Sequence, residues 1–419
     1  MLNVLLKIMK LLFKVSIVLI LTSFFGILNA ETMKSIQDYG VLPTNSPEVN
    51  RDNLQKAIDE ASKRGGALFV PPVGRGYPMA SGIVLKHNVS LIGINGPLGR
   101  GSIAKFDEHP MYDPASSAFR IMDAEKPFIT IQSYTKIKGI QFYYPKQGWT
   151  PDKVIKYPPT IQQDTFALSV TLQELSFWGE YIAMNFADTK GTCEQVLIEH
   201  CYGYPLSGEF IRIGNCSDIN RILHCHVNPG TMRAFRGDYM RKGMVDYVVN
   251  QKKYAVWIGR GDNIVIMDLH VFGAYGACYF SKRSYGQLTN FSFDCVVNGI
   301  YKSGRDQKQH QWMISQGSII ANAGSNIDEV WPIIIEGKGH TAITNVEAFS
   351  GGHSALVNVG ASKGFLLVKG KDPLTVSMYG CRMYNYTDKE PIQVLNRKAS
   401  LRAKDCVGKD LQFFDLEIN

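Results

Sequence analysis

Two stretches decide the fold: IVIMDLHVFG, from Ile264 to Gly273, and NFSFDCVVNG, from Asn290 to Gly299. When Ile264 is aligned with Asn290, the two stretches superimpose and Asp268 falls on Asp294. Both are short β-rich segments that end at a glycine. A repeat of this length, with β-rich segments and bends at Gly or Asn, is the sequence signature of a solenoid.

Pairs of cysteines recur at nearly the same spacing: Cys193 with Cys216, Cys201 with Cys225, and Cys381 with Cys406. Leucine-rich and ankyrin repeats have periods near this range, but they need a Leu lattice or a helix pair in each unit, and neither is visible. The sequence therefore predicts a parallel β-helix. Its eight cysteines either stack as reduced small hydrophobes or form disulfides.

Composition favours one large body. The chain has 419 residues with 39 glycines, 11% aromatic and 20% charged residues, which argues against disorder and suits a fold with many turns. No Pro-, Ser- or charge-rich linker interrupts it. We therefore expect residues 31–419 to form a single β-helix domain, with residues 31–95 as its N-terminal cap and first coils.

The segment from Met1 to Ala30 has the pattern of a signal peptide. Lys7, Lys10 and Lys14 precede an apolar run at 17–28, and the small Ala30 stands at a plausible cleavage point. The expected location is secreted or periplasmic, with an uncleaved N-terminal anchor as the alternative. Removal of the three lysines lowers the formal charge from +8 to +5. This basic excess favours an anionic polysaccharide as partner.

A short amphipathic helix is expected near the start of the mature chain. Between Asp52 and Ser62, apolar residues recur at helical spacing, and Asn50 or Asp52 is placed to cap the helix. Such a helix would cover the open end of the first coil, which would otherwise expose apolar surface and strand edges.

A family resemblance appears over the run from Ile36 to Ile94. It contains DYG at 38–40, NLQKAIDEA at 53–61, GGALFVPP at 65–72, Tyr77 and NVSLIGI at 88–94. This run resembles the opening of the pectate lyase and polygalacturonase-like superfamily. The resemblance implies a right-handed parallel β-helix and, in most members, a secreted enzyme that cuts polysaccharides; phage tailspikes share the fold.

The catalytic signatures of that superfamily are missing. TNSPEVNRDN at 44–53 stands where the family usually has GDG-x-TDD. The chain has no Asp-Asp pair, no Gly-His-Gly and no Arg-Ile-Lys of polygalacturonases, nor the Trp-x-Asp-His and Arg-x-Pro of pectate lyases. No catalytic residue can be carried over.

The site is therefore sought in the coil itself. If Val265, Met267 and Leu269 face inward, Asp268 faces outward. Matching IGNCSDINRILHCHV at 213–227 to IGRGDNIVIMDLHV at 258–271 then extends a polar column over successive coils. Its predicted members are His200, Tyr202, His224, His226, Asp268, His270 and Asp294.

This column allows several chemistries. Stacked Asp268 and Asp294 would form the acid and base pair of a glycoside hydrolase. A polysaccharide lyase would instead use a base, supplied by His224, His226 or His270, and a cation to neutralise a uronate carboxylate. The same groups could hold a divalent metal, or form a polar ladder without chemistry.

Basic residues near the column are candidates for substrate binding. The interruption between Pro229 and Lys253 is too long for a tight bend, and long loops on rigid scaffolds often carry function. The predicted substrate-binding residues are Arg233, Arg236, Arg241, Tyr202, Arg260 and Arg283. Glu347 is a further candidate, though an ordinary surface carboxylate is the plainer interpretation. Aromatic residues at 142–144, with Trp149 and Trp178, predict either a sugar platform or stacked core rings.

The sequence as a whole favours an exported enzyme that degrades an acidic, pectin-like polysaccharide, most simply a glycoside hydrolase. A lyase and a non-catalytic glycan-binding or adhesion solenoid are the alternatives. No dedicated metal site is assigned, the cofactor is left unknown with a divalent cation more expected of a lyase, and no nucleic acid or stable membrane span is expected. A homo-oligomer is left open.

Overall fold

The computed structural model describes residues 33–94, 116–123, 125–187, 191–229, 243–304, 311–323, 330–350 and 360–419. The chain divides into two units, Met1–Lys34 and Ser35–Asn419, and the second is the one described below. The predicted signal peptide lies outside the described residues and stays a prediction. Within the described part, no helix combines the length and apolar character needed to cross a membrane.

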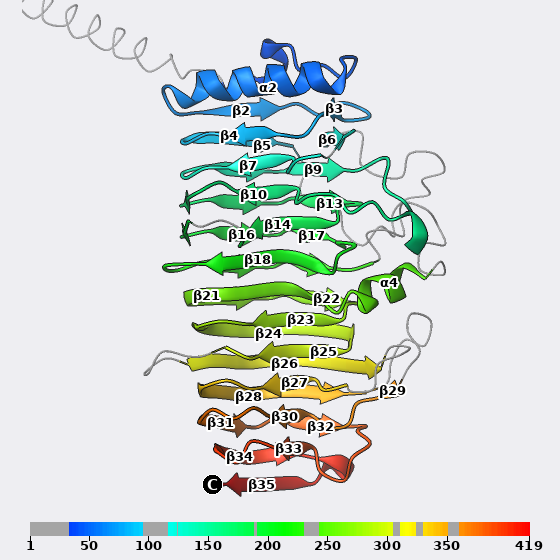
Figure 1. Cartoon of the computed structure of the whole chain (residues 1–419), viewed down its shortest axis with the longest axis vertical. Coiled ribbons are helices and arrows are strands. Elements are labelled where there is room, and N and C mark those ends of the chain that lie inside the picture. Colours follow the sequence, from blue (N-terminus) through cyan, green and yellow to red (C-terminus); the bar gives the residue numbers. More distant parts are fainter. Residues whose placement is uncertain are drawn as a thin grey trace, which may run out of the picture. The chain divides into compact units, whose positions relative to one another are not determined.

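The second unit is a stack of coils (Figure 1). Each coil adds strands to three faces, and each strand pairs in parallel with its equivalent in the previous coil; hydrogen bonds join 33 strands into one sheet. The predicted right-handed parallel β-helix is confirmed.

The first face contains one strand from each coil. Its strands are β2 (Gly66–Val70), β5 (Val89–Gly93), β8 (Lys136–Lys138), β12 (Thr171–Gln173), β16 (Leu197–Glu199), β19 (Arg221–Leu223), the second part of β21 (Tyr254–Met267), the first parts of β24 (Ser284–Val296), β26 (Gln311–Ala323) and β28 (Gly339–Phe349), and then β31 (Leu374–Tyr379) and β34 (Ala399–Val407).

The second face follows around a corner. Its strands are β3 (Tyr77–Met79), β6 (Ser117–Ile121), β9 (Ile140–Tyr143), β13 (Ser176–Trp178), β17 (Tyr202–Gly203), β20 (His226–Val227), β22 (His270–Phe272), the second parts of β24, β26 and β28, and β32 (Arg382–Tyr384).

The third face closes each coil. Its strands are β4 (Ile83–Leu85), β7 (Ile129–Ile131), β10 (Ile161–Gln163), β14 (Ile182–Phe186), β18 (Glu209–Asn215), the first part of β21, β23 (Gly276–Phe280), β25 (Asn298–Lys302), β27 (Ile333–Ile335), β30 (Leu366–Val368) and β33 (Ile392–Val394).

A few elements lie outside the three faces. They are β1 (Lys34–Ser35), η1 (Ile36–Tyr39), α2 (Pro47–Ser62), η2 (Pro151–Lys153), the pair β11 (Ala167–Leu168) and β15 (Cys193–Glu194), α4 (Met244–Asn250), β29 (Gly360–Ala361), η4 (Lys409–Leu411) and β35 (Phe413–Ile418). β29 and β35 are antiparallel to β26 and β34.

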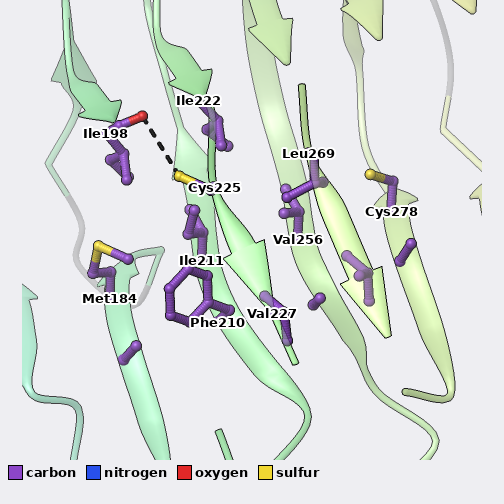
Figure 2. Close-up of a cluster of buried hydrophobic side chains, with 14 of the residues drawn as sticks. Met184, Ile198, Phe210, Ile211, Ile222, Cys225, Val227, Val256, Leu269 and Cys278 are labelled. Carbon is purple, nitrogen blue, oxygen red and sulfur yellow. Dashed lines mark hydrogen bonds between the residues drawn. The ribbon is translucent and has the colours of Figure 1, made fainter. Parts of the chain in front are cut away.

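The interior is filled by apolar side chains from all three faces (Figure 2). Ile198 and Ile222 stand in register on the first face, and Ile211 and Val256 stand in register on the third. Burial of these rows removes apolar area from water at every coil, which is the main stabilising term for such a stack.

A single left-handed residue forms the corner between the first and second faces in successive coils. The non-glycine corner residues have φ between 51° and 55°: Glu174, His200, His224, Asp268, Asn290, Gln316, Asn345 and Asp405. Gly139 and Gly380 occupy equivalent positions with φ of 67° and 62°. This conformation is costly for most side chains and is tolerated best by Gly, Asn, Asp and His. The polar character of the corner therefore has a backbone cause.

The corner also corrects the predicted inward set. Ile264 and Ile266 are fully buried, whereas Val265 and Met267 lie half-buried on the outer side. Asp268 then turns the backbone, and Leu269 is buried again. Side chains along a strand alternate between inward and outward, and a left-handed residue interrupts this alternation. The inward positions before Asp268 therefore do not predict the inward positions after it.

The N-terminal helix is longer than predicted. α2 begins at Pro47 rather than Asp52, because Ser46 is its N-cap and accepts a hydrogen bond from the amide of Val49. Asn50 lies inside the helix and bonds backbone groups of Leu42 and Pro78. The apolar side of α2 packs on β2, β3 and β4 (Figure 1).

All eight cysteines are buried free thiols. Cys193 stands beside Cys216 in the adjacent coil, and the other two predicted pairs occupy equivalent register positions. The stacked, reduced alternative is the one that the structure shows.

Aromatic side chains form a ladder outside the third face. Trp257, Tyr279 and Tyr301 are in register, and the last two rings stack at 4.9 Å with an angle of 7°. Arg212 lies over Trp257 and Lys369 over Tyr301, each 5.4 Å from the ring centroid. Cations therefore close both ends of the ladder, so its ring faces are occupied from within the protein.

A second left-handed corner gives a stability prediction. Ile219 has φ of 52°, a strained conformation for a β-branched residue. We expect Ile219→Asn to raise the free energy of unfolding by about 1 kcal/mol, measured by chemical denaturation. The control Leu223→Asn changes an extended, outward residue of β19 and should give no gain. An equal or lower stability of Ile219→Asn would contradict the strain.

One buried carboxyl gives a pH prediction. Glu180 is fully buried, and burial raises its pKa to about 8, only partly offset by the backbone amides of Glu180 and Tyr204. The folded state then keeps a proton that the unfolded state loses above its ordinary value near 4.5. Stability should therefore fall between pH 4.5 and 8, by at most about 1.4 kcal/mol per pH unit.

Replacement of this carboxyl tests the pH effect. Glu180→Gln should flatten the stability profile over that window, while Glu174→Gln, at a partly exposed corner, should leave the slope in place. Denaturant titrations at several pH values measure it, and an unchanged slope in Glu180→Gln would assign the pH dependence to other groups.

Candidate functional site

The outer surface of the second face carries a column of polar side chains. Parallel pairing aligns Tyr202, His226, His270, Ser292, Ser318, Glu347 and Arg382 in successive coils. We call these seven residues the central column. Neighbouring coils lie about 4.8 Å apart, so the column extends for about 29 Å along the stack.

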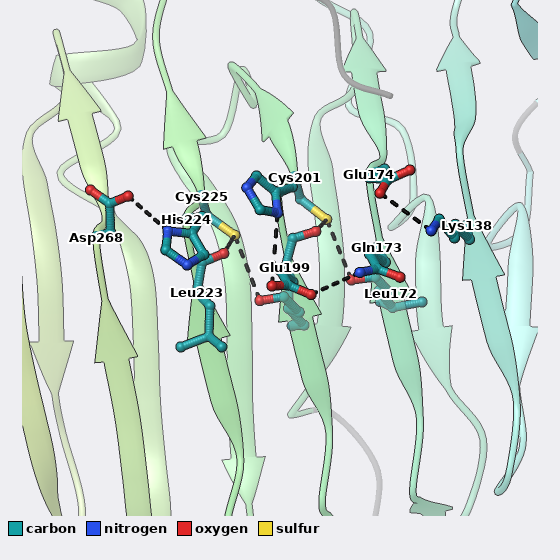
Figure 3. A network of polar contacts seen from close by, with 12 residues as sticks. Lys138, Leu172, Gln173, Glu174, Glu199, Cys201, Leu223, His224, Cys225 and Asp268 are labelled. Carbon is teal, nitrogen blue, oxygen red and sulfur yellow. Dashed lines mark hydrogen bonds and ion pairs between the residues drawn. The ribbon is translucent and has the colours of Figure 1, made fainter. Parts of the chain in front are cut away.

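The predicted polar column is present, but as two parallel rows. His200, His224 and Asp268 belong to the corner, two residues before the central column. The rings of His200 and His224 stack at 4.9 Å, and Nδ1 of His224 lies 2.8 Å from Oδ2 of Asp268 (Figure 3). The three side chains therefore contact one another: His200 stacks on His224, and His224 pairs with Asp268.

The central column begins with aromatic contacts. The ring of Tyr202 lies 5.4 Å from that of His226, and His226 lies 4.4 Å from His270 at an angle of 89°. Burial raises the pKa of Tyr202, so its phenol stays protonated and can donate a hydrogen bond. The predicted stacking of Tyr202, His226 and His270 is confirmed.

The predicted pairing of Asp268 with Asp294 is wrong. His270 pairs with Ser292 and Phe272 with Asp294, so the offset between these two coils is shorter than the one that aligns Ile264 with Asn290. Asp294 therefore lies four residues along the strand from the position opposite Asp268, about 13 Å away. The two carboxylates do not form the stacked acid and base pair.

Asp294 has an unusual environment of its own. It lies at a bulge between Phe293 and Val296, where Cys295 has φ of 52°. Its side chain is half-buried, and Oδ1 is shielded from solvent without a hydrogen-bond partner among the described residues. A buried, unsatisfied carboxylate oxygen costs free energy, so such a group on a surface face is a candidate for function.

A hollow of about 400 Å³ opens at the later part of the central column. Its polar lining comes from Gln316, Ser318, Asn345, Glu347 and Arg382. Gly380 leaves room at the corner, because a Cβ there would stand 2.5 Å from Oδ1 of Asn345. A side chain at this corner would therefore collide with Asn345, one of the polar residues that line the hollow.

Glu347 is held in place inside this hollow. The hydroxyl of Tyr384 donates a hydrogen bond of 2.6 Å to Oε1 of Glu347, and the Tyr384 ring stacks on Phe349 at 4.8 Å. Burial and the neighbouring carboxylate raise the pKa of Tyr384 to about 12, so the phenol remains a donor. The hydrogen bond from Tyr384 thereby holds Oε1 of Glu347, a residue that lines the hollow.

Of the arginines of the predicted basic groove, the described residues include only Arg260 and Arg283, so the groove stays a prediction. Arg260 bonds Asp262 at 2.8 Å and the carbonyl of Cys216, at the corner between the third and first faces. Arg283 is exposed and directly precedes β24, at the corner between the third and first faces. The first face lies between it and the central column. Arg233, Arg236 and Arg241 lie outside the described residues.

The predicted aromatic platform belongs to the core. Phe142, Tyr144, Trp149 and Trp178 are all buried, and Phe142 stacks on Phe177 at 5.3 Å. Of the two interpretations of these rings, core packing is the correct one. Within the described residues, no cluster of three or more His, Cys, Asp and Glu side chains has the geometry of a metal site.

Ser318, Arg382 and Tyr384 were missed by the sequence reasoning. Glu347 and Arg382 are adjacent in space, but the segment that connects their coils is longer than the spacing of the cysteine pairs. A search at that regular spacing could not reach Arg382. Glu347 and Arg382 each stand alone on an outward strand position, and the sequence contains no other pattern that links them.

Comparisons with known proteins support the fold. No protein-family model matches this chain, and no curated protein matches it. Among solved structures, the chain is similar to a hyperthermoactive exopolygalacturonase from Thermotoga maritima, with 13% identity over 93% of this chain and 94% of that one and a TM-score of 0.52.

It is also similar to the tailspike protein of E. coli bacteriophage HK620. A mutant of that protein in complex with a pentasaccharide matches with 12% identity over 90% of this chain and 66% of the tailspike chain, with a TM-score of 0.54. At these identities the similarity establishes the parallel β-helix fold.

The ion pair between His224 and Asp268 gives a prediction about stability. The side chains of His224 and Asp268 are 34% and 54% exposed, and exposed ion pairs contribute little. We expect Asp268→Asn to change the free energy of unfolding by less than about 1 kcal/mol in a denaturant titration at pH 6. A loss of several kcal/mol would show that the corner depends on this pair.

Proposed function

We propose that this chain is an exported enzyme that degrades polysaccharide, a glycoside hydrolase that binds its polymer along the central column. The observation that carries the proposal is the column itself. It presents hydroxyl, imidazole, carboxylate and guanidinium groups on one outer face, and its later part opens into the hollow at Glu347. An extended polymer can follow such a row, because the scaffold repeats at every coil.

The resemblance in fold is consistent with this proposal. The solved structures with the same fold include a protein named an exopolygalacturonase and one in complex with a pentasaccharide. The modest positive charge expected of the mature chain favours an acidic polymer, as the sequence suggested.

Asp294 and Glu347 are the proposed catalytic carboxylates. Two coils separate them along the stack, about 10 Å, and Asp294 lies two residues further along its strand than the central column. The axial and lateral offsets together put the two backbones about 12 Å apart. Retaining enzymes hold their carboxyl groups about 5 Å apart and inverting ones about 6.5 to 9.5 Å apart, so side chains that extend toward each other from this distance would reach the inverting range first. We therefore propose inverting hydrolysis.

Each carboxylate has a role that its contacts favour. Glu347, whose Oε1 accepts a hydrogen bond from Tyr384, would accept a proton from the attacking water, since a donated hydrogen bond stabilises a carboxylate. Asp294, with one shielded oxygen that lacks a partner among the described residues, would protonate the glycosidic oxygen. His226, His270 and Tyr202 would contact the sugar chain on the side of Asp294, while Asp268 and His224 hold each other at the corner.

The test separates three classes of function. Release of reducing ends and ultraviolet absorbance would be followed on acidic and neutral polysaccharides, with and without a chelator. A hydrolase releases reducing ends without new absorbance. A lyase produces an absorbing unsaturated uronide, and a binding module releases nothing; either result would overturn the hydrolase assignment.

Two substitutions test the proposed carboxylates. Asp294→Asn and Glu347→Gln should each lower kcat by about 10² to 10⁴-fold without loss of folding, because each removes a proton donor or acceptor. Glu174→Gln, which removes a carboxylate at the corner several coils away, serves as the control with full activity. Full activity in Asp294→Asn or Glu347→Gln would refute the assignment of that residue.

A further inference from the structure

Arg382 stands at the end of the central column without a carboxylate partner. It is exposed, and no ion pair joins it to any described acidic residue, although Glu347 is its direct neighbour on β28. Glu347 accepts instead from the hydroxyl of Tyr384. The guanidinium is therefore available to a ligand in the hollow that it lines.

The remaining lining of the hollow suits a sugar ring. Gln316, Asn345 and Ser318 supply amide and hydroxyl groups that both donate and accept hydrogen bonds. The floor is formed by Val346, Gly317 and the ring of Phe291, which lies so close to Gly317 that a Cβ there would clash with it. The charged groups of the lining are Arg382 and Glu347, and of these only Arg382 can pair with an anionic substituent on an otherwise hydroxylated ligand.

We propose that the hollow is the subsite for a sugar unit that bears a carboxylate, with Arg382 as the residue that determines this specificity. The inference rests on the proposed function and deepens it. A guanidinium matches the two coplanar oxygens of a carboxylate in a bidentate pair. Ring hydroxyls of the same unit reach Glu347, Asn345 and Ser318, so the acid group is directed away from Glu347.

Binding to a catalytically silent protein tests the subsite. Asp294→Asn protein would be titrated with polygalacturonate, alginate and hyaluronate, and with each polymer after chemical reduction of its carboxylates. In this background, Arg382→Gln should weaken binding to the preferred acidic polymer at least tenfold and leave the binding of the reduced polymer unchanged. Arg382→Lys should restore part of the loss, since it keeps the charge but not the planar fork.

The controls distinguish the possible failures. Arg221→Gln removes an exposed arginine of the first face and should bind like the parent. Equal loss on acidic and reduced polymers, tighter binding to dextran sulfate than to any uronate polymer, or no binding to any uronate polymer would overturn the subsite. Hydrolysis of a neutral polysaccharide by the wild-type protein would, in that case, leave the proposed function intact.

Discussion

The left-handed residue between the first and second faces is the constraint on which the rest of the structure depends. It turns the chain in one position, so that strands on both sides can continue the same parallel ladders. It also selects the side chains of the corner, because only Gly, Asn, Asp and a few others tolerate that backbone well. The polar character of His200, His224 and Asp268 therefore has a backbone cause that is independent of any chemistry.

The same register that builds the core creates different surfaces on different faces. On the third face, Trp257, Tyr279 and Tyr301 are in register, and the rings of Tyr279 and Tyr301 stack. Arg212 lies over Trp257 and Lys369 over Tyr301. Side chains of the protein itself therefore cover the ring faces at both ends of that ladder. The central column of the second face ends differently, because Gly380 opens the corner and Arg382 has no acidic partner among the described residues. This contrast is the reason why we propose the end of the central column as the surface that binds a ligand.

Rigid spacing also limits the chemistry. A coil stack holds outward groups about 4.8 Å apart along its axis and about 6.6 Å apart along a strand, so two carboxylates can take only a few separations. Retaining hydrolysis would need carboxylates in adjacent coils of one column, and Asp268 and Asp294 do not meet that condition. The backbones of Asp294 and Glu347 are two coils and two residues apart, about 12 Å, a separation from which extended side chains would reach the inverting range before the retaining one.

The sequence by itself determined the solenoid, the inward cysteine pairs and the alignment of Tyr202 with His226 and His270, because these follow from local periodicity within coils of similar length. It also identified Asp294 and Glu347 as separate candidates. Only the tertiary structure decided which groups are neighbours. The turn from β22 to β24 shortens the repeat, and the connection before Arg382 lengthens it, so a fixed period misplaces both Asp294 and Arg382. The left-handed corner residue also interrupts the alternation of inward and outward side chains, and a sequence pattern of period two cannot show where this happens.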